Sequence, residues 1–330
     1  MIEMPPLQFA PTNGIRMGYY AAGPVSDRPP MVLCHGWPEL AFSWRHQIKA
    51  LSEAGIRVIA PDQRGYGATD RPEAVEAYDI AQLTADLIGL LDHLRIDKAI
   101  FVGHDWGGFV VWQMPLRYPE RVAGVVGVNT PHMARAPADP IAIFRKRFGD
   151  MMYIVQFQDP AREPDRIFNS HVEATFDAFM RKPLPRTEAG TAEPVAGIGA
   201  APKANLAFPQ MVAAYDASRD TRPPILSDAE KQVFVDTFRR TGFTGGINWY
   251  RNMTRNWQRS EGIDVTVRVP SLMIMAENDA VLPPSAADGM EKLIPDLEKY
   301  LVRDSGHWTQ QEQPEEVSAK LIEWRRRRFG

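Results

Sequence analysis

At the two ends of the chain, short apolar segments rich in β-branched residues recur at intervals. They cover residues 31–34, 57–60, 99–102, 122–128, 271–275 and 299–302. Longer stretches with helical periodicity lie between several of them. In the clearest stretch, residues 81–94, one face carries Leu83, Leu87, Leu90, Leu91 and Leu94. Strands that alternate with helices predict an α/β fold, in which helices cover both faces of a mostly parallel sheet.

Between residues 133 and 263 the strand pattern stops, and the sequence predicts helices instead. The segment LSDAEKQVFVDTFRRTG is typical of them. Ser227 suits its N-cap, Glu230 suits the reciprocal capping-box position, and Gly242 suits the residue after its last turn. Residues 182–205 are rich in Pro, Ala and Gly without a period, which predicts a long mobile loop.

The chain has 330 residues, more than the roughly 250 to 300 at which single hydrophobic cores usually stop growing. One main domain with a sizeable insertion agrees with the change of pattern along the chain. We therefore expect a core formed by residues 1–132 and 264–330, interrupted by a helical cap at residues 133–263.

Apolar residues make up 44% of the chain and charged residues 24%, as in globular proteins that bury a substantial core. The formal net charge of −3 does not indicate the basic surface with which proteins bind nucleic acid. The basic run at residues 325–328 ends a helical pattern. We interpret it as charge that complements the helix dipole and not as a nucleic-acid or membrane site.

The single cysteine, Cys34, lies in an apolar strand pattern, where a free thiol usually behaves as a small buried hydrophobe. The N-terminal sequence MIEMPPLQFA has no charged segment followed by an apolar one. No apolar run approaches the ~20 residues that span a membrane. These features predict a cytoplasmic protein that binds neither membranes nor nucleic acid.

The segment FVGHDWGGFV, residues 101–110, has the outline of a nucleophile elbow, in which a strand turns sharply into a helix around a reactive side chain. Gly103 and Gly107 occupy the positions where the turn is too tight for a side chain, and Asp105 occupies the centre. Alternatively, Asp105 is only the N-cap of the helix. Pro115 lies inside that helix and predicts a helix shortened to about two turns.

His307 follows the last apolar segment and is the candidate base, because elbow enzymes carry nucleophile, acid and base in that chain order. The acid is expected after the strand SLMIMA, where Glu277 and Asp279 flank the neutral Asn278. We favour Asp279, because the chain must turn out of the strand before a carboxylate can face the histidine. In the alternative, either carboxylate caps the turn before Pro283.

The segment HGWP, residues 35–38, follows an early strand at the place where an elbow enzyme draws one of its two oxyanion N–H donors. The two donors would be the backbone N–H groups of Trp37 and Trp106. In the alternative interpretation, Gly36 and Pro38 form an ordinary turn and Trp37 packs against apolar surface.

The motifs HGWPE, DQRGYGATDRP, GHDWGG, NWYRNMTRNW and GHWTQ together resemble the α/β-hydrolase-fold epoxide hydrolases over nearly the whole chain. GHDWGG alone is shared with haloalkane dehalogenases, whereas its combination with NWYRNM is much more specific. The resemblance implies an inserted helical cap with two tyrosines that hold the epoxide oxygen. MMYIVQFQ matches the first tyrosine motif through Tyr153, and NWY matches the second through Tyr250.

The resemblance assigns the nucleophile to Asp105, the base to His307 and the orienting acid to Asp279, with no cofactor and no metal. The residues expected to contact the substrate are His35, Pro38, Trp249 and Trp308. Trp37 stands where Phe is common in the family, which puts the substrate range in doubt more than the reaction type.

Both cap tyrosines could instead be buried aromatic residues with one hydrogen bond each, the usual role of tyrosine in a helical region. A third tyrosine of the insertion, Tyr215, matches no motif and is expected to be structural. The match at both Tyr153 and Tyr250 favours the functional interpretation.

A carboxylate nucleophile suits an epoxide, because attack on an sp³ carbon leaves an alkyl group on the nucleophile. On serine the product would be an ether, which activated water does not readily cleave. On Asp105 it is an ester, whose carbonyl group water activated by His307 can attack. The N–H groups of Trp37 and Trp106 would then stabilise the oxyanion, and a vicinal diol would leave.

Two other functions stay open. A haloalkane dehalogenase would use the same Asp105, His307 and Asp279 but would hold a halide with N–H donors such as the Trp106 indole. A ligand-binding protein that retains this fold would be expected to have lost the nucleophile or the base, and both are present. The expected partners are a small epoxide and water, and the sequence allows a monomer or a homodimer.

Overall fold

The computed structural model describes residues 2–183 and 206–330, so the loop predicted at residues 182–205 lies almost entirely outside the described residues. The described chain forms two compact units. We call them the core unit, made of Ile2–Arg71, Ile80–Ala134 and Gly262–Gly330, and the helical unit, made of Pro72–Asp79 and Arg135–Glu261.

The segment Pro72–Asp79 belongs to the helical unit, although the sequence analysis assigned it to the core. Its short helix η2 (Val75–Tyr78) packs against α10 (Thr244–Arg251). The side chain of Asn252 donates a hydrogen bond to the carbonyl of Val75 at 2.6 Å, and Arg259 pairs with Asp79. These contacts join residues far apart in sequence, and local periodicity carries no information about them.

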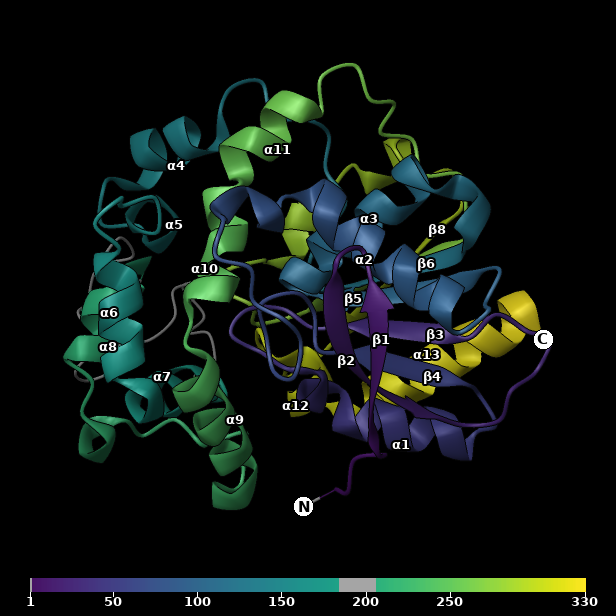
Figure 1. Cartoon of the computed structure of the whole chain (residues 1–330), viewed down its shortest axis with the longest axis horizontal. Helices are drawn as coiled ribbons and strands as arrows, with labels where there is room; N and C mark the ends of the chain where they lie inside the picture. Colours follow the sequence, from purple (N-terminus) through teal and green to yellow (C-terminus); the bar gives the residue numbers. More distant parts are fainter. Residues whose placement is uncertain (1, 184–205) are drawn as a thin grey trace. The chain divides into compact units, whose positions relative to one another are not determined.

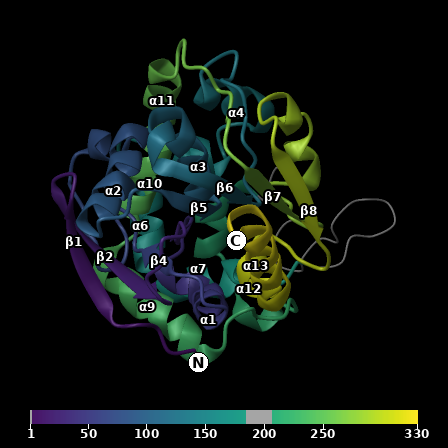
Figure 2. The ribbon, with the colours of Figure 1, turned by 90° about the vertical axis from the view of Figure 1, so that its right-hand side faces the viewer.

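An eight-stranded sheet runs through the core unit (Figure 1). In spatial order its strands are β1 (Leu7–Thr12), β2 (Ile15–Ala22), β4 (Val58–Pro61), β3 (Met31–Cys34), β5 (Ala99–His104), β6 (Val122–Val128), β7 (Ser271–Ala276) and β8 (Leu297–Val302). β2 pairs antiparallel with β1 and β4, and the other neighbours pair parallel. Figure 2 shows β1 and β8 at opposite edges. The mostly parallel sheet predicted from the sequence is confirmed.

All six predicted apolar segments are strands, but the hairpin of β1 and β2 was not predicted. β1 is largely solvent-facing, with only Ala10 and Thr12 buried, so its apolar signal is weak. The two-residue turn between the strands is Asn13-Gly14, and both residues have positive φ, 39° and 77°. Asn-Gly between two short strands is a strong hairpin signal, and it would have revealed this element.

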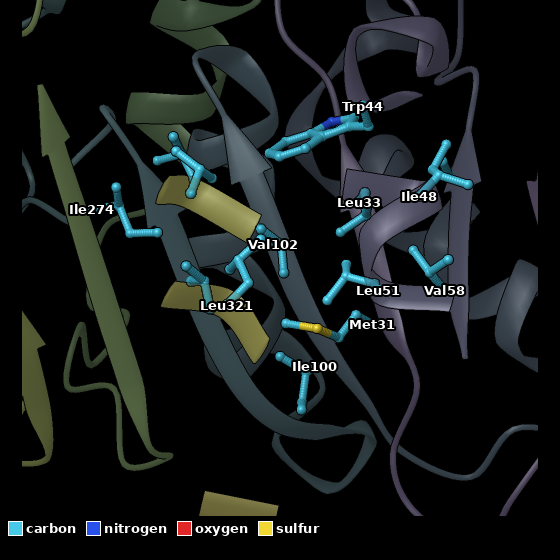
Figure 3. Packing of buried hydrophobic residues seen from close by; sticks show 14 of the residues in the cluster. Met31, Leu33, Trp44, Ile48, Leu51, Val58, Ile100, Val102, Ile274 and Leu321 are labelled. Carbon is cyan, nitrogen blue, oxygen red and sulfur yellow. The ribbon is translucent and has the colours of Figure 1, made fainter. Parts of the chain in front are cut away.

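One face of the sheet packs against α1 (Arg45–Glu53) and α13 (Pro314–Phe329), as Figure 3 shows. Side chains of a strand alternate between the two faces, so residues two apart share this one. Leu33 of β3 and Val102 of β5 belong to this cluster together with Leu51 of α1 and Leu321 of α13. Full burial of each such side chain stabilises the fold by roughly 1.5–3 kcal/mol.

The helices α2 (Ile80–His93) and α3 (Trp106–Arg117) lie on the opposite side of the sheet from α1 and α13 (Figures 1 and 2). The predicted leucine face of α2 is confirmed at the buried residues Leu83, Leu87, Leu90 and Leu91. Leu94 comes just after the helix and is only partly buried.

The predicted shortening of the helix after Asp105 is wrong. α3 continues for 12 residues and includes Pro115. Proline lacks an N–H, but Pro115 is near the end of the helix and removes only one backbone hydrogen bond there. The rest of the helix keeps its hydrogen bonds, which explains why it does not end earlier.

The C-terminal helix α13 ends in basic residues, as the sequence predicts. Arg327 pairs with Glu298 and Arg328 pairs with Asp296. The remaining short helices of the core unit are η1 (Ala41–Trp44), η3 (Pro119–Arg121), η6 (Pro284–Ala287), η7 (Met290–Lys292) and α12 (Thr309–Glu312).

The helical unit has no named strand within its described ranges. Its remaining elements are α4 (Pro140–Phe148), α5 (Tyr153–Gln156), α6 (Glu163–Ser170), α7 (Val172–Phe179), α8 (Phe208–Ala213), η5 (Ala217–Arg219), α9 (Asp228–Thr241) and α11 (Met253–Arg259). The predicted capping box of α9, with Ser227 and Glu230, is confirmed, and Gly242 follows the helix. None of the helices described in either unit is long and apolar enough to cross a membrane.

The stability of the core unit can be tested at one buried ion pair. Arg64 donates two hydrogen bonds to Asp86, at 2.6 and 2.7 Å, and both side chains are almost fully buried. Asp86→Ala should lower the free energy of unfolding by about 3–5 kcal/mol, because Arg64 would stay buried without its counter-ion. Urea denaturation measures this loss.

The matched control is Glu53→Ala, which breaks the exposed pair with Lys49. Its cost should be at most ~1 kcal/mol, because exposed pairs contribute little. Equal small losses in the two variants would contradict a stabilising role for the Arg64–Asp86 pair.

Candidate active site

Asp105 lies between the end of β5 and the start of α3, at a sharp turn of the chain. Its φ of 50° and ψ of −121° are unusual for a residue with a side chain, and such strained conformations are typical of nucleophile elbows. The hydroxyl of Thr130 donates a hydrogen bond to the Asp105 carbonyl at 2.7 Å. The turn predicted from GHDWGG is therefore present, with Asp105 at its centre.

The elbow depends on glycine at the predicted positions. A Cβ atom on Gly103 would overlap the backbone carbonyl of Gly107, and a Cβ atom on Gly107 would overlap the carbonyl of Cys34. β5 and α3 therefore approach each other, and β3, more closely than any side chain would allow. This packing puts Asp105 directly beside the HGWP segment that follows β3.

The side chain of Asp105 faces that segment. The backbone N–H of Trp37 donates a hydrogen bond to Asp105 Oδ1 at 2.8 Å, and the bond is buried. A Cβ atom on Gly36 would lie 2.5 Å from the same oxygen, so only glycine leaves room for it. Asp105 makes no side-chain cap hydrogen bond to α3. Asp105 thus occupies the N-cap position of α3, but its side chain faces Trp37 and does not cap the helix.

His307 lies in the loop after β8, and Asp279 lies in the loop after β7. His307 Nδ1 is 2.9 Å from Asp279 Oδ2, and His307 Nε2 is 3.6 Å from Asp105 Oδ2. Glu277, the other predicted candidate, instead accepts a hydrogen bond from the backbone N–H of Asp304. The structure thus brings together Asp105, His307 and Asp279.

Several donors fix the carboxylate of Asp279. Its Oδ1 accepts hydrogen bonds from the backbone N–H groups of Val281 and Leu282, at 2.8 and 2.9 Å. Its Oδ2 accepts one from the side chain of Asn129 at 2.7 Å, in addition to the contact with His307. Asp279 is fully buried, and these partners hold it as an anion that orients the imidazole.

The electrostatics of the three residues are coupled. Burial alone would raise the pKa of Asp279, but the neighbouring His307 and the N–H donors outweigh it and hold the pKa well below its ordinary value. Burial alone would lower the pKa of His307, but Asp279 and Asp105 raise it well above its ordinary value. Loss of the Asp105 charge would therefore lower the pKa of His307, and a lower pKa lets the imidazole act as a base near neutral pH.

The sequence analysis missed two buried residues beneath the site, Glu39 and His104. His104 Nδ1 is 2.6 Å from Glu39 Oε2, and His104 Nε2 donates to the carbonyl of His307 at 2.6 Å. Burial raises the pKa of Glu39, but His104 and the N–H of Gly36 outweigh it and lower the pKa to about 2. Both residues belong to the motifs HGWPE and GHDWGG, and their position in these motifs was the available signal.

The other predicted site residues of the core unit lie around the same edge of the sheet. His35 is fully buried, with Nδ1 2.9 Å from the Gly36 carbonyl and Nε2 accepting from the N–H of Gln63, so its polar atoms are used within the protein. Pro38 follows a cis peptide bond and is buried. Trp308 packs edge-on against His307, with ring centroids 4.8 Å apart. Trp106 is the first residue of α3.

In the helical unit, the two predicted tyrosines are neighbours. The rings of Tyr153 and Tyr250 meet edge-on with centroids 5.7 Å apart, and Tyr153 also stacks on Phe208 at 4.2 Å. Trp249, beside Tyr250 on α10, is fully buried. Tyr215 donates its hydroxyl to the carbonyl of Asp177 at 2.9 Å and contacts Asp220, as a structural residue would.

Across residues 2–183 and 206–330, no group of three or more His, Cys, Asp or Glu side chains could hold a metal ion.

Asp105→Asn should lower the pKa of His307, because it removes one of the two carboxylates that raise this pKa. NMR titration of the His307 ring protons measures the shift. Asp304→Asn is the matched control, since Asp304 is an exposed carboxylate three residues before His307. An unchanged His307 pKa in the Asp105 variant would contradict an effect of the Asp105 charge on this pKa.

Comparisons with known proteins identify the family of the chain. Residues 29–314 match the family described as the alpha/beta hydrolase fold. Epoxide hydrolase A of Mycobacterium tuberculosis is 42% identical over 95% of both chains, and bifunctional epoxide hydrolase 2 of Mus musculus is 38% identical over 94% of this chain and 53% of its own. The crystal structure of epoxide hydrolase A from Mycobacterium thermoresistibile has a TM-score of 0.84 and 40% identity, with 98% of each chain covered. The chain therefore belongs to the epoxide hydrolases of the α/β-hydrolase fold.

Proposed function

We propose that this protein hydrolyses epoxides to vicinal diols through an ester on Asp105. The observation that carries the proposal is a carboxylate at the nucleophile position, with a His307–Asp279 pair beside it. Serine at this position would suit acyl transfer, whereas a carboxylate suits attack on an sp³ carbon. The curated relatives named as epoxide hydrolases, one of them 42% identical over 95% of the chain, support the same reaction.

In the first step, Asp105 Oδ2 attacks an epoxide carbon, and the C–O bond of the ring breaks. Oδ2 is the oxygen available for attack, because Oδ1 is held by the Trp37 N–H. Tyr153 and Tyr250 donate hydrogen bonds to the epoxide oxygen, and one phenol transfers its proton to the developing alkoxide. The result is an alkyl ester whose carbonyl oxygen is Asp105 Oδ1.

In the second step, His307 takes a proton from water, and the hydroxide attacks the ester carbonyl of Asp105. Ester formation has removed the Asp105 charge, which lowers the pKa of His307 and suits it to this role. The negative charge of the tetrahedral intermediate develops on Oδ1, where the Trp37 N–H already donates. We assign the second oxyanion donor to the Trp106 N–H, as the sequence predicts.

The intermediate collapses when the alkyl oxygen leaves as the second hydroxyl of the diol, with the proton from His307. The remaining proton on Asp105 restores the phenol, so that one epoxide and one water give one diol. The chain needs no metal or cofactor for this sequence of steps. Pro38, Trp249 and Trp308 are proposed to line the apolar part of the substrate site. The sequence analysis placed His35 with them, but both of its ring nitrogens are bonded within the protein, so we assign it instead to holding the HGWP segment in place.

The haloalkane dehalogenase alternative would use the same three core residues. A halide leaves without a proton, however, so that reaction would give no role to two adjacent phenols such as Tyr153 and Tyr250. A ligand-binding role without catalysis is disfavoured, because Asp105 and His307 are both present and Asp279 orients His307.

We also propose a cytoplasmic location for the protein, which agrees with the free, buried thiol of Cys34.

His307→Gln should stop the reaction at the ester, because Asp105 can still attack but water is no longer activated. Intact-mass spectrometry after exposure to a simple aryl epoxide should show a gain equal to the substrate mass, and tandem fragmentation should place it on Asp105. The unmodified protein should convert the same epoxide to its diol without added metal.

A protein that is inert to a panel of epoxides but releases halide from haloalkanes would overturn the proposal in favour of the dehalogenase. Diol formation without any adduct in His307→Gln would retain the reaction but exclude the ester mechanism.

Tyr153→Phe and Tyr250→Phe should each slow ester formation, because two donors share the charge of one oxygen. The double variant should lose about 10²- to 10⁴-fold, the usual contribution of a positioned proton donor. Single-turnover kinetics measure this step. Tyr215→Phe is the matched control and should leave the rate unchanged, and full activity in both single variants would refute the assignment.

A further inference from the structure

Glu312 is a buried carboxylate that contacts the loop of the candidate base from below. Its Oε2 accepts a hydrogen bond from the backbone N–H of Gly306 at 2.8 Å, and its Oε1 accepts one from the N–H of Trp308 at 2.9 Å. Gly306 and Trp308 are the two residues on either side of His307. One side chain therefore fixes the backbone both before and after the base.

The carbonyl groups of the same loop are also bonded. The Gly306 carbonyl accepts from the Thr309 hydroxyl at 2.8 Å and from the Asn129 side chain at 3.2 Å, and the His307 carbonyl accepts from His104 at 2.6 Å. Glu312 thus completes a set of hydrogen bonds that leaves the base loop little freedom to rotate. Functional groups held to within about 0.5 Å of the productive position need this kind of support.

A carboxylate is a costly choice for this position. Glu312 is only 6% exposed, and among the described residues no Lys or Arg forms a salt bridge with it. Burial raises its pKa, against the lowering effect of the two N–H donors and of His307. A glutamine would be cheaper to bury, but its amide offers only one acceptor oxygen for two N–H groups that meet two different oxygens. The carboxylate suits the loop because both of its oxygens accept.

The charge of Glu312 also suits the second step of the reaction. The neighbouring His307 lowers the pKa of Glu312, although burial outweighs this effect. His307 becomes positively charged when it takes the proton from water, so a nearby anion favours that state. Among the contacts described for these residues, no hydrogen bond joins Glu312 to Asp105 or to Trp37, so the bonds of Glu312 lie with the loop of the base and not with the nucleophile.

Glu312 itself is anchored, because it ends the short helix α12 (Thr309–Glu312), whose side chains reach into the core. Gln310 donates to Glu39 at 2.8 Å, and Gln311 accepts from Arg45 at 2.7 Å. These contacts fix α12 against the core, and with it the backbone that carries Glu312.

We propose that Glu312 is a positioning residue for His307 and that it serves the hydrolysis of the ester selectively. The inference rests on the proposed function. Loss of Glu312 should slow the second step and leave the first unchanged, whereas loss of a purely structural residue would affect both steps.

The test uses the full chain and single-turnover kinetics with an aryl epoxide, in which loss of epoxide reports ester formation and appearance of diol reports hydrolysis. Glu312→Gln should slow hydrolysis by roughly 10- to 100-fold, the scale on which misplaced catalytic groups lose rate. Ester formation should change less than about twofold, so the mass adduct on Asp105 should accumulate. Glu312→Asp, which keeps both acceptors, should recover part of the hydrolysis rate.

Glu315→Gln is the matched control, because Glu315 is exposed at the start of the next helix, α13, and the same change there should leave both steps as in the unmodified protein. Amide hydrogen exchange at Gly306 and Trp308 gives a readout that does not need substrate, and it should become faster in Glu312→Gln. Equal slowing of both steps, or unchanged exchange at the two amides, would overturn the role of Glu312. Failure of the unmodified protein to form any diol would instead overturn the proposed function, and the exchange measurement would still test the contact.

Discussion

The hydrogen bond from the Trp37 N–H to Asp105 Oδ1 is the interaction on which the candidate site depends. It gives the two oxygens of one carboxylate different environments, since Oδ1 is held by the backbone and Oδ2 faces His307. The bond requires the strained backbone of Asp105 and the absence of a side chain at Gly36. In the mechanism proposed above, the same bond leaves Oδ2 to attack and stabilises the charge that later forms on Oδ1.

The parallel sheet collects the remaining groups at one edge. Trp37 follows β3, Asp105 follows β5, Asn129 follows β6, Asp279 follows β7 and His307 comes after β8. In parallel strands the carboxyl ends lie at the same edge, where ligands of open α/β sheets bind. β6 and β7 are direct neighbours although the segment Arg135–Glu261 of the helical unit separates them in sequence, so this insertion leaves the register of the edge intact.

Beneath this edge lies a layer of buried polar residues, including Glu39, His104 and Glu312. Buried charges are costly for stability, and each of these is satisfied by several hydrogen bonds. Through these hydrogen bonds the three side chains hold the backbone of two segments, the HGWP turn and the loop of His307. The layer is thus best understood as support for the geometry of the site, at some expense to the stability of the fold.

The sequence by itself determined the strands of the parallel core, the elbow around Asp105 and the family, because these features reside in short segments whose spacing is visible along the chain. The sequence also favoured Asp279 over Glu277, and the structure places Asp279 at His307. The tertiary structure alone decided that Pro72–Asp79 joins the helical unit and that Glu312 turns back onto the base loop. The physical reason is the same in each case. A hydrogen bond between loops depends on where neighbouring strands end in space, and local periodicity does not encode that position.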